Sequence, residues 1–158
     1  MTEKKIKTQE ELAEIIRMEK TSGRKVGFTN GCFDILHIGH VRYLAEAKKN
    51  CDVLAIGVNS DSSVRGLKGE TRPVNSQDAR LEVLAALACV DYVTVFEDST
   101  PEKLIKKLCP DILFKGGDWQ EENVVGGDFV RSRGGIVRII PYVDGYSTTA
   151  IIHKMRET

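Results

Sequence analysis

Hydrophobic residues are arranged along this chain in two ways, at helical spacing and in short continuous runs. Thr8 and Glu11 have the spacing of a capping box, and the apolar positions after them keep a helical period until Gly23, which predicts a first helix. Residues 53–58 are almost continuously apolar, as expected of a strand that is covered on both faces. The pattern therefore indicates a mixture of helices and buried strands.

Helical and strand patterns alternate over the rest of the chain. Strands are predicted at residues 25–29, 53–58, 92–96, 112–115 and 136–142. The first helix is predicted to follow Thr8, and the second covers residues 39–50. Three more helices are predicted: one from a cap at Asn75 or Ser76 through Ala88, one from Thr100 and Pro101 through Leu108, and one at residues 147–156. Two longer stretches, residues 60–75 and 116–135, are expected to be irregular and functional. This order predicts an α/β fold, a Rossmann-like doubly wound single domain over residues 1–158 with about five parallel strands.

Composition and charge restrict the classes of protein and partner. With 158 residues, 41% of them hydrophobic and 29% charged, the chain has the balance of a globular domain. Its 23 Lys and Arg equal its 23 Asp and Glu, so no overall charge favours nucleic acid or an anionic membrane, and an anion site must be local. No apolar run approaches roughly 18 residues, and the first residues lack an apolar segment, so we expect a cytoplasmic protein. The cysteines are widely spaced and are interpreted as reduced thiols: Cys32, Cys51, Cys89 and Cys109.

The turn after the first predicted strand carries the strongest chemical pattern. Open α/β sheets bind ligands beyond the carboxyl ends of their strands, where this turn lies. His37 and His40 are three positions apart at a predicted helix start, so their imidazoles can face the same way beside unpaired N–H groups that favour phosphate. Gly39 lets a nucleotide lie close to the backbone, and Asp34 is a candidate to orient one imidazole or hold a metal ion.

Two other interpretations apply to the paired histidines. One histidine can cap the helix while the other is buried and hydrogen-bonded, which is the expected case for a lone histidine. The pair can also bind a metal ion, but only Cys32 or Asp34 is near enough in sequence to add a ligand, and the Glu of a zinc-protease helix is missing. Two histidines around a glycine at a strand-to-helix junction favour the phosphate site.

A second motif can bind the other end of a triphosphate. Gly145 and Tyr146 precede three hydroxyl side chains that open the last predicted helix, Ser147, Thr148 and Thr149. Hydroxyls beside free N–H groups can surround terminal phosphates. Taken alone, the motif is better explained by N-capping from Ser147 or Thr148. Its pairing with the first motif favours the phosphate role.

A site for two anionic reactants also needs cations. Two unit charges in close contact repel by about 4 kcal/mol at an effective dielectric constant near 20. The candidates are Arg65, Lys68, Arg72 and Lys115. Lys115 is the strongest because it ends an apolar strand on the binding edge, and Lys68 follows because glycines flank it.

Six residues of the first motif match the first signature of a known superfamily: Gly31, Phe33, Asp34, His37, Gly39 and His40. In this pattern the chain resembles the HIGH-type, cytidylyltransferase-like nucleotidyltransferases. The resemblance implies that the two histidines contact the phosphates near the reacting α-phosphorus, while the nucleotide lies over the glycine. The chain departs from several relatives at Ile152, where they carry a basic residue, although His153 and Lys154 follow it.

Motifs and resemblance together define the expected site. The catalytic residues are expected to be His37, His40, Lys68 and Lys115. The nucleotide contacts are expected to be Thr29, Asn30, Gly31, Phe33, Asp34, Gly39, Lys115, Gly117, Asp118, Tyr146, Ser147, Thr148 and Thr149. The acceptor contacts are expected to be Arg65, Lys68 and Arg72, with Mg²⁺ accompanying ATP and no metal ligand supplied by the protein.

Three further stretches narrow the resemblance: residues 59–75 with their Arg-Gly-Leu-Lys-Gly-Glu core, the Lys-Gly-Gly-Asp-Trp sequence at 115–119, and residues 145–152. With the span 5–155 they look like the adenylyltransferase domains of bifunctional heptose kinase/adenylyltransferases. This implies ATP and D-glycero-β-D-manno-heptose 1-phosphate as substrates, ADP-heptose and pyrophosphate as products, and a step toward the lipopolysaccharide core. We expect a stand-alone enzyme that follows a separate sugar kinase, the alternative being a domain cut from a longer protein, and by analogy a homodimer.

Two rival functions fit the same motifs. A cytidylyltransferase acting on glycerol 3-phosphate or a related alcohol phosphate has similar signatures, but those enzymes carry an Arg-Thr pair where this chain has Tyr142 and Val143. A rival of another class is a nucleotide-binding sensor without turnover, or a metal-binding module built on the two histidines and Cys32. The intact histidine pair argues against the sensor, and the lack of further ligands argues against the metal module.

Overall fold

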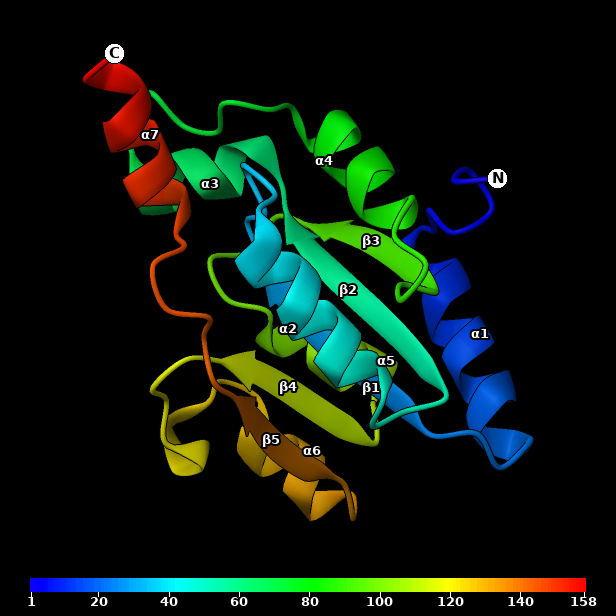
Figure 1. Ribbon diagram of the computed structural model, residues 1–158. Coiled ribbons are helices and arrows are strands. Elements are labelled where there is room, and N and C mark those ends of the chain that lie inside the picture. Colours follow the sequence, from blue (N-terminus) through cyan, green and yellow to red (C-terminus); the bar gives the residue numbers. More distant parts are fainter.

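Figure 1 shows a twisted parallel sheet with helices packed on both faces. The computed structural model describes all residues, 1–158. Its five strands lie in the order β3-β2-β1-β4-β5, and every neighbouring pair is parallel. The strands are β1 (Val26–Gly31), β2 (Val53–Asn59), β3 (Tyr92–Phe96), β4 (Ile112–Gly116) and β5 (Ile136–Ile140). The predicted α/β class, with about five parallel strands, is confirmed.

The helices divide between the two faces because successive side chains of a strand point to opposite sides. On β2, Val53 and Ala55 belong to one hydrophobic cluster, and Leu54 and Ile56 belong to the other. The first cluster joins the sheet to α1 (Gln9–Thr21), α5 (Glu102–Leu108) and α6 (Gly127–Ser132). The second joins it to α2 (Ile38–Lys48) and α4 (Gln77–Ala85). This explains why the β2 sequence is continuously apolar.

Several predicted helix starts are confirmed by their caps. Thr8 and Glu11 form the expected capping box of α1. The Ser76 hydroxyl accepts a hydrogen bond from the N–H of Ala79 at the start of α4. Pro101 lies at the cap position of α5, one residue before the expected place. None of the helices is both long and apolar enough to span a lipid bilayer.

The prediction that residues 60–75 are irregular is wrong for their first half. A helix, α3 (Asp61–Lys68), follows β2 directly. Ser60 caps it by accepting from the N–H of Ser63 at 3.1 Å, and Val64 is fully buried beneath it. The sequence does not show a helical pattern here, because only one turn of this helix faces the core and the other positions are polar residues and Gly66.

The stretch 116–135 is also more regular than predicted. It contains a short 3₁₀ helix, η1 (Glu121–Asn123), and α6, whose first turn includes a glycine. A connection between two parallel strands must cross a face of the sheet, which favours a helix even in a glycine-rich sequence. The ends of several elements also differ from the prediction; for example, β1 continues to Gly31, α4 stops at Ala85, and β5 stops before Pro141.

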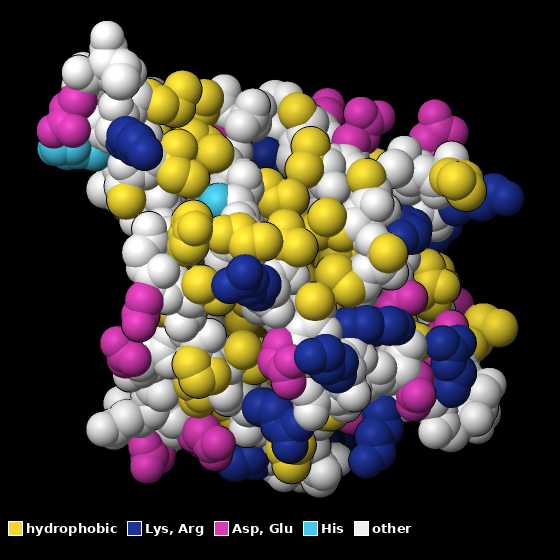
Figure 2. All heavy atoms as spheres, in the orientation of Figure 1, with side chains coloured by type: hydrophobic (Ala, Val, Ile, Leu, Met, Phe, Trp, Pro, Cys, Tyr) yellow, Lys and Arg dark blue, Asp and Glu magenta, His cyan; other side chains and the backbone are white.

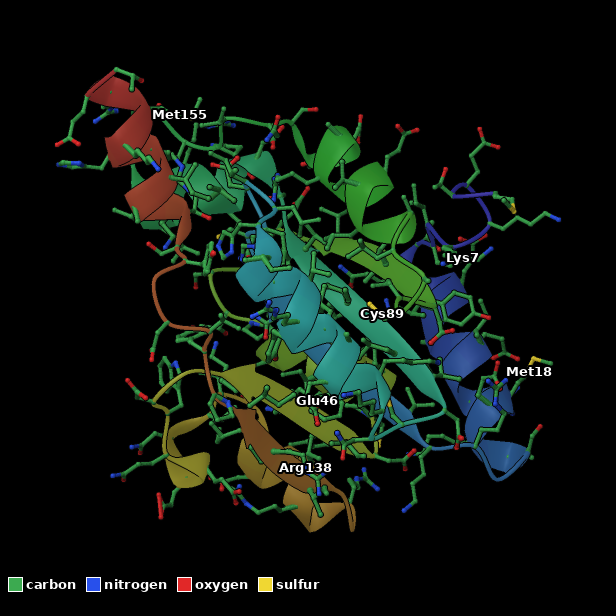
Figure 3. All side chains as sticks on the ribbon, in the orientation of Figure 1. Lys7, Met18, Glu46, Cys89, Arg138 and Met155 are labelled. Atoms are coloured by element: carbon green, nitrogen blue, oxygen red, sulfur yellow. The ribbon has the colours of Figure 1, made fainter.

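Because the strands are parallel, their carboxyl ends lie along one edge of the sheet. The starts of α2 and α3 and the chain after β4 lie at this edge in Figure 1, and the linker from β5 to α7 (Thr148–Arg156) runs along it. Figure 3 shows α7, marked by Met155, at the opposite end of the molecule from Arg138 of β5. The fold therefore brings the two predicted motifs and the glycine-rich stretches to one edge.

Candidate active site

The turn out of β1 is under backbone strain. Phe33 has a φ of +47°, a left-handed conformation that costs a residue with a side chain about 1–2 kcal/mol. Its buried ring lies against Gly31, where an added Cβ would come within 3.0 Å, and its centroid is 5.3 Å from that of His40. Strain of this kind tends to persist where function requires a particular geometry. Here it places a ring behind the second histidine.

His37 and His40 stack on each other at the start of α2, with ring centroids 3.9 Å apart. Nδ1 of His37 accepts from the N–H of Gly39 at 3.1 Å, and Nδ1 of His40 accepts from the N–H of His37 at 3.4 Å. The rings therefore cap the helix and use two of the N–H groups that the sequence assigned to phosphate. Because each Nδ1 is an acceptor, each neutral ring carries its proton on Nε2. The pair can offer two Nε2–H donors to a ligand.

Both imidazoles are neutral at pH 7 in the absence of a ligand. Burial lowers the pKa of His37 below its usual 6.5. Burial and the neighbouring His37 lower the pKa of His40 to about 4. The histidines can thus donate hydrogen bonds to phosphate oxygens without contributing charge, so the charge of a triphosphate must be balanced by other groups.

Asp34 ties the turn of the first motif to the segment before α4. It is only 3% exposed, and its carboxylate accepts from Arg72 Nε at 2.6 Å and from the N–H groups of Val74 and Asn75 at 2.8 and 2.9 Å. Burial acts to raise the pKa of Asp34, but these three donors together lower it below its usual value. The Asp34 carboxylate therefore binds this segment and hydrogen-bonds neither imidazole, so it does not orient a histidine. Arg72, expected to contact the acceptor, is the partner of Asp34 in this ion pair.

Arg80 is a second anchor of the site, and the sequence did not single it out. Its guanidinium is 2% exposed and donates to the carbonyl oxygens of Cys32, Asn59 and Asn75 at 2.6, 2.8 and 3.0 Å. It also pairs with Asp61 at 2.9 Å. One side chain therefore joins the ends of β1 and β2 to the segment before α4. A signal was present, because Arg80 lies four residues before buried Leu84 on the apolar face of α4.

The cationic side chains expected at the site differ in burial and in whether they form ion pairs. Lys115, half-buried at the end of β4, forms no ion pair, and burial lowers its pKa. Its Nζ lies 5.0 Å from the centroid of the Trp119 ring. Lys68 and Arg65 are exposed on α3 and form no ion pair. A half-buried lysine without an acidic partner is costly, which marks Lys115 as a candidate to receive an anion.

The second motif lies against the first at the start of α7. The Ser147 hydroxyl caps this helix by accepting from the N–H of Ala150 at 3.0 Å. The Thr148 hydroxyl donates to the carbonyl of Ile35 at 3.3 Å, and Thr149 is exposed. A Cβ on Gly39 would lie 3.6 Å from Tyr146 and even nearer to His37, so this glycine keeps the passage between the motifs open. Figure 2 shows histidine atoms at the surface here, bordered by hydrophobic side chains.

The remaining expected contacts belong to the same edge. The hydroxyls of Thr29 and Tyr43 hydrogen-bond at 2.7 Å, and burial raises the pKa of Tyr43. Asn30 and Gly31 end β1, Gly117 has a φ of +96°, and Asp118 is exposed. The ring of Tyr142 covers Gly117 so closely that an added Cβ would overlap it. The structure thus places the predicted residues on elements and loops that meet the carboxyl edge of the sheet.

The residues at this edge fit a divalent ion that arrives with a triphosphate. No group of three or more His, Cys, Asp or Glu side chains is arranged to hold a metal ion. Mg²⁺ usually keeps several waters and binds through phosphate oxygens and one or two carboxylates. Such an ion needs no protein cage, and exposed Asp118 is the carboxylate nearest in sequence to Lys115.

Comparisons with known proteins agree with this geometry. The chain is 55% identical over 156 residues to the bifunctional protein HldE of Trichlorobacter lovleyi, covering 99% of this chain and 32% of that protein. It is 55% identical over 151 residues to the bifunctional protein HldE of Geobacter metallireducens, covering 96% of this chain and 31% of that protein. The chain therefore spans about a third of the length of these relatives.

Solved structures give the same fold. A lipopolysaccharide core biosynthesis protein from Thermoplasma volcanium matches with a TM-score of 0.64 and 30% identity, over 79% of this chain and 100% of that one. The pantoate-β-alanine ligase of Francisella tularensis matches with a TM-score of 0.61 over 97% of this chain and 78% of that one, and at 17% identity it shows the fold alone. The family model described as cytidylyltransferase-like matches residues 28–154. The chain therefore belongs to the cytidylyltransferase-like family of nucleotidyltransferases.

Proposed function

We propose that this chain transfers AMP from ATP to D-glycero-β-D-manno-heptose 1-phosphate, forming ADP-heptose and pyrophosphate for the lipopolysaccharide core. The observation that carries the proposal is the pair of stacked imidazoles with two Nε2–H donors, placed on the same edge as Lys115 and the hydroxyls of α7. A site with neutral donors and unpaired cations suits a reaction in which charge moves between phosphates.

In this mechanism a phosphate oxygen of the acceptor attacks the α-phosphorus of ATP. The bond from the α-phosphorus to the bridging oxygen breaks, and pyrophosphate leaves with the electron pair. His37 and His40 donate hydrogen bonds to the phosphate oxygens, and Lys115 and Lys68 neutralise the charge that collects on them. A Mg²⁺ ion that arrived with the triphosphate would supply further neutralisation of the leaving group, and Asp118 would be the carboxylate available to it. No covalent intermediate is needed, because positioning and charge stabilisation suffice.

The acceptor assignment is supported by the resemblance of residues 59–75, 115–119 and 145–152 and by relatives named for a bifunctional protein and for lipopolysaccharide core biosynthesis. Arg65 and Lys68 on α3 suit an acceptor phosphate because neither is paired within the chain. The acceptor would come from a sugar kinase, and the cytoplasm, which supplies ATP, is the proposed compartment.

A matrix assay tests the proposal. Purified protein with Mg²⁺ is incubated with ATP, CTP, GTP or UTP and with a panel of sugar and polyol phosphates, and pyrophosphate release is measured. We expect ATP with the heptose 1-phosphate to give the highest kcat/KM. Faster turnover of CTP with glycerol 3-phosphate would select the cytidylyltransferase instead, and turnover with no pair would overturn the enzymatic function.

A variant connects the activity to the histidines. Replacing His40 by Ala should lower kcat/KM by about 10²- to 10³-fold, the usual effect of removing one preorganised donor. His153→Ala is the matched control, because this third histidine is exposed at the end of α7 and contacts only Glu157. Circular dichroism checks that both variants fold, and full activity in folded His40→Ala would contradict the proposed role.

A further inference from the structure

A pair of hydroxyl groups joins β1 to α2. The hydroxyl oxygens of Thr29 on β1 and Tyr43 on α2 are 2.7 Å apart and share a hydrogen bond. Thr29 is only 1% exposed, so its hydroxyl is withdrawn from solvent and depends on this partner. Burial raises the pKa of Tyr43, so the phenol stays protonated and the hydrogen bond joins two neutral groups.

The seam between β1 and β4 is open toward the site. β1 pairs with β2 along its whole length. With β4 it pairs only in its first half, Gly27 with Ile112 and Phe28 with Leu113. The ends of the two strands, which lead to the histidines and to Lys115, are therefore not held together by a main-chain ladder. Something other than the backbone must fix the distance between them.

Tyr43 spans this seam. It follows His40 by three positions on α2, so the two side chains are neighbours on one side of the helix. Its hydroxyl reaches Thr29 just after the pairing of β1 with β4 has ended. Its ring lies against Gly116, the residue after Lys115, where an added Cβ would come within 3.3 Å of the ring. One side chain, carried by the helix of the histidines, thus contacts both strands.

The hydroxyl pair is better suited to alignment than to packing. An apolar ring alone would fill the space between helix and sheet, and two buried hydroxyls that bond each other add little stability over apolar groups of the same shape. A directional hydrogen bond does fix how α2 lies relative to β1. Catalysis is sensitive to such distances, since a misplacement of about 1 Å can lower a rate about 10²-fold.

We propose that Tyr43 is a positioning residue, which holds the first motif and the end of β4 at the distance that lets His40 and Lys115 act on the same triphosphate. The inference rests on the proposed nucleotidyl transfer and adds to it a residue that contacts neither reactant. Tyr43 acts through Thr29 on one side of the seam and through Gly116 on the other. Its loss should therefore lower kcat more than it weakens the binding of either substrate.

Steady-state kinetics of variants test the alignment. Tyr43→Phe keeps the ring and removes the hydroxyl, and we expect kcat to fall about 5- to 50-fold while both KM values stay within about threefold. Thr29→Val should cause a similar loss, which Thr29→Ser should largely avoid because it keeps the hydroxyl.

The double variant separates a shared hydrogen bond from two independent roles. Tyr43→Phe combined with Thr29→Val should lose little more activity than either change alone, because both break the same bond. Tyr92→Phe is the matched control, since this tyrosine is also partly buried and its hydroxyl forms no hydrogen bond within the chain. Losses that multiply in the double variant, or a loss confined to KM in Tyr43→Phe, would overturn the positioning role.

The fluorescence of Trp119 tests the alignment without turnover. It is the only tryptophan of the chain, and the ammonium of Lys115 lies 5.0 Å from its ring centroid. Tyr43→Leu removes both the hydroxyl and the ring against Gly116, so the end of β4 should shift. The emission maximum of the unligated protein, or its quenching by acrylamide, should then change, whereas Tyr92→Leu should leave both unchanged.

This readout keeps the two proposals distinguishable. If the unsubstituted protein turns over no pair of substrates, the proposed function fails, and a changed emission in Tyr43→Leu still supports the alignment of the two strands. Circular dichroism checks that both leucine variants fold. An unchanged emission and unchanged quenching in folded Tyr43→Leu would overturn the positioning role whatever the activity of the protein.

Discussion

Two groups of segments lie on opposite sides of β1 and are attached to the sheet by different means. The cationic flank is α3 and residues 69–76, which follow β2, and the aromatic flank is residues 115–123 and 141–147, at and after the ends of β4 and β5. The cationic flank is held by two buried charged side chains, Asp34 and Arg80, which together bind residues 72–75 and the ends of β1 and β2. The aromatic flank is held by a hydrogen bond from the N–H of Gly117 to the carbonyl of Ile140, by an exposed hydrogen bond from Arg131 to the carbonyl of Glu121, and by exposed rings. The segment carrying Arg72 is therefore built into the core, whereas the aromatic flank lies at the surface.

The largest effect is expected from Arg80→Met, which should destabilise the protein by about 3–5 kcal/mol, measured as the free energy of unfolding in denaturant. Three carbonyls and Asp61 would lose a buried charged donor. Arg17→Met is the matched control, because Arg17 forms only an exposed pair with Glu14 and should change stability by less than about 1 kcal/mol. Equal effects of the two substitutions would remove the basis of the comparison.

Asp34→Asn should destabilise by about 2–3 kcal/mol, because the amide cannot accept as well from Arg72 and two backbone N–H groups. The folded-state pKa of Asp34 is lowered, so its contribution is present above the unfolded value of 3.8 and is lost as pH falls through the lower folded value. Unfolding measured between pH 5 and 2.5 should therefore show a weaker acid dependence in the variant. Asp98→Asn, which alters an exposed pair with Lys103, should leave that dependence unchanged.

The histidine pair between the flanks should add a pH dependence at milder acidity. Both pKa values are lowered by folding, so the unfolded chain binds more protons below 6.5, and stability should fall as pH drops from 6.5 toward about 4. The melting temperature of the protein should decline more steeply over this range than that of His40→Gln. Parallel curves would mean that the pKa of His40 is not lowered in solution.

The smallest effect on stability is expected from Tyr142→Ala on the aromatic flank. Its ring covers Gly117 but is 67% exposed, so its loss should cost less than about 1 kcal/mol in thermal or denaturant unfolding. A destabilisation as large as that of Asp34→Asn would show that the aromatic flank is as firmly built as the cationic one.

Much of the fold could be predicted from local patterns. The continuous apolar run of β2 and the caps at Thr8 and Ser76 predicted elements that the structure contains. The helix α3 was missed because its Ser60 cap and single buried turn are set among polar residues and glycines, where propensity is weak. The helix α6 was missed for a related reason, since a crossover between parallel strands imposed it on a glycine-containing sequence.

The candidate site could be predicted in its motifs but not in its supports. His37, Gly39 and His40 lie within four consecutive positions of the sequence, so their chemistry can be recognised before the fold is known. Arg80 acts on groups that lie up to 48 residues away, and no local pattern reports such contacts. The ion pair between Arg72 and Asp34 joins residues 38 positions apart, so it also forms only on folding. It leaves fewer unpaired cationic side chains at the site than the sequence suggests.

The sequence by itself determined the order of the five strands and of the helices α1, α2, α4, α5 and α7, and it indicated the residues of a candidate phosphate site, because periodicity, caps and a short motif are local properties of the chain. Only the tertiary structure decided which nitrogen of each histidine faces a ligand and which cations remain unpaired. It also decided that the aromatic flank lies across β1 from the cationic flank. These properties depend on burial and on contacts between residues far apart in the chain, which exist only after the parallel strands have aligned their carboxyl ends.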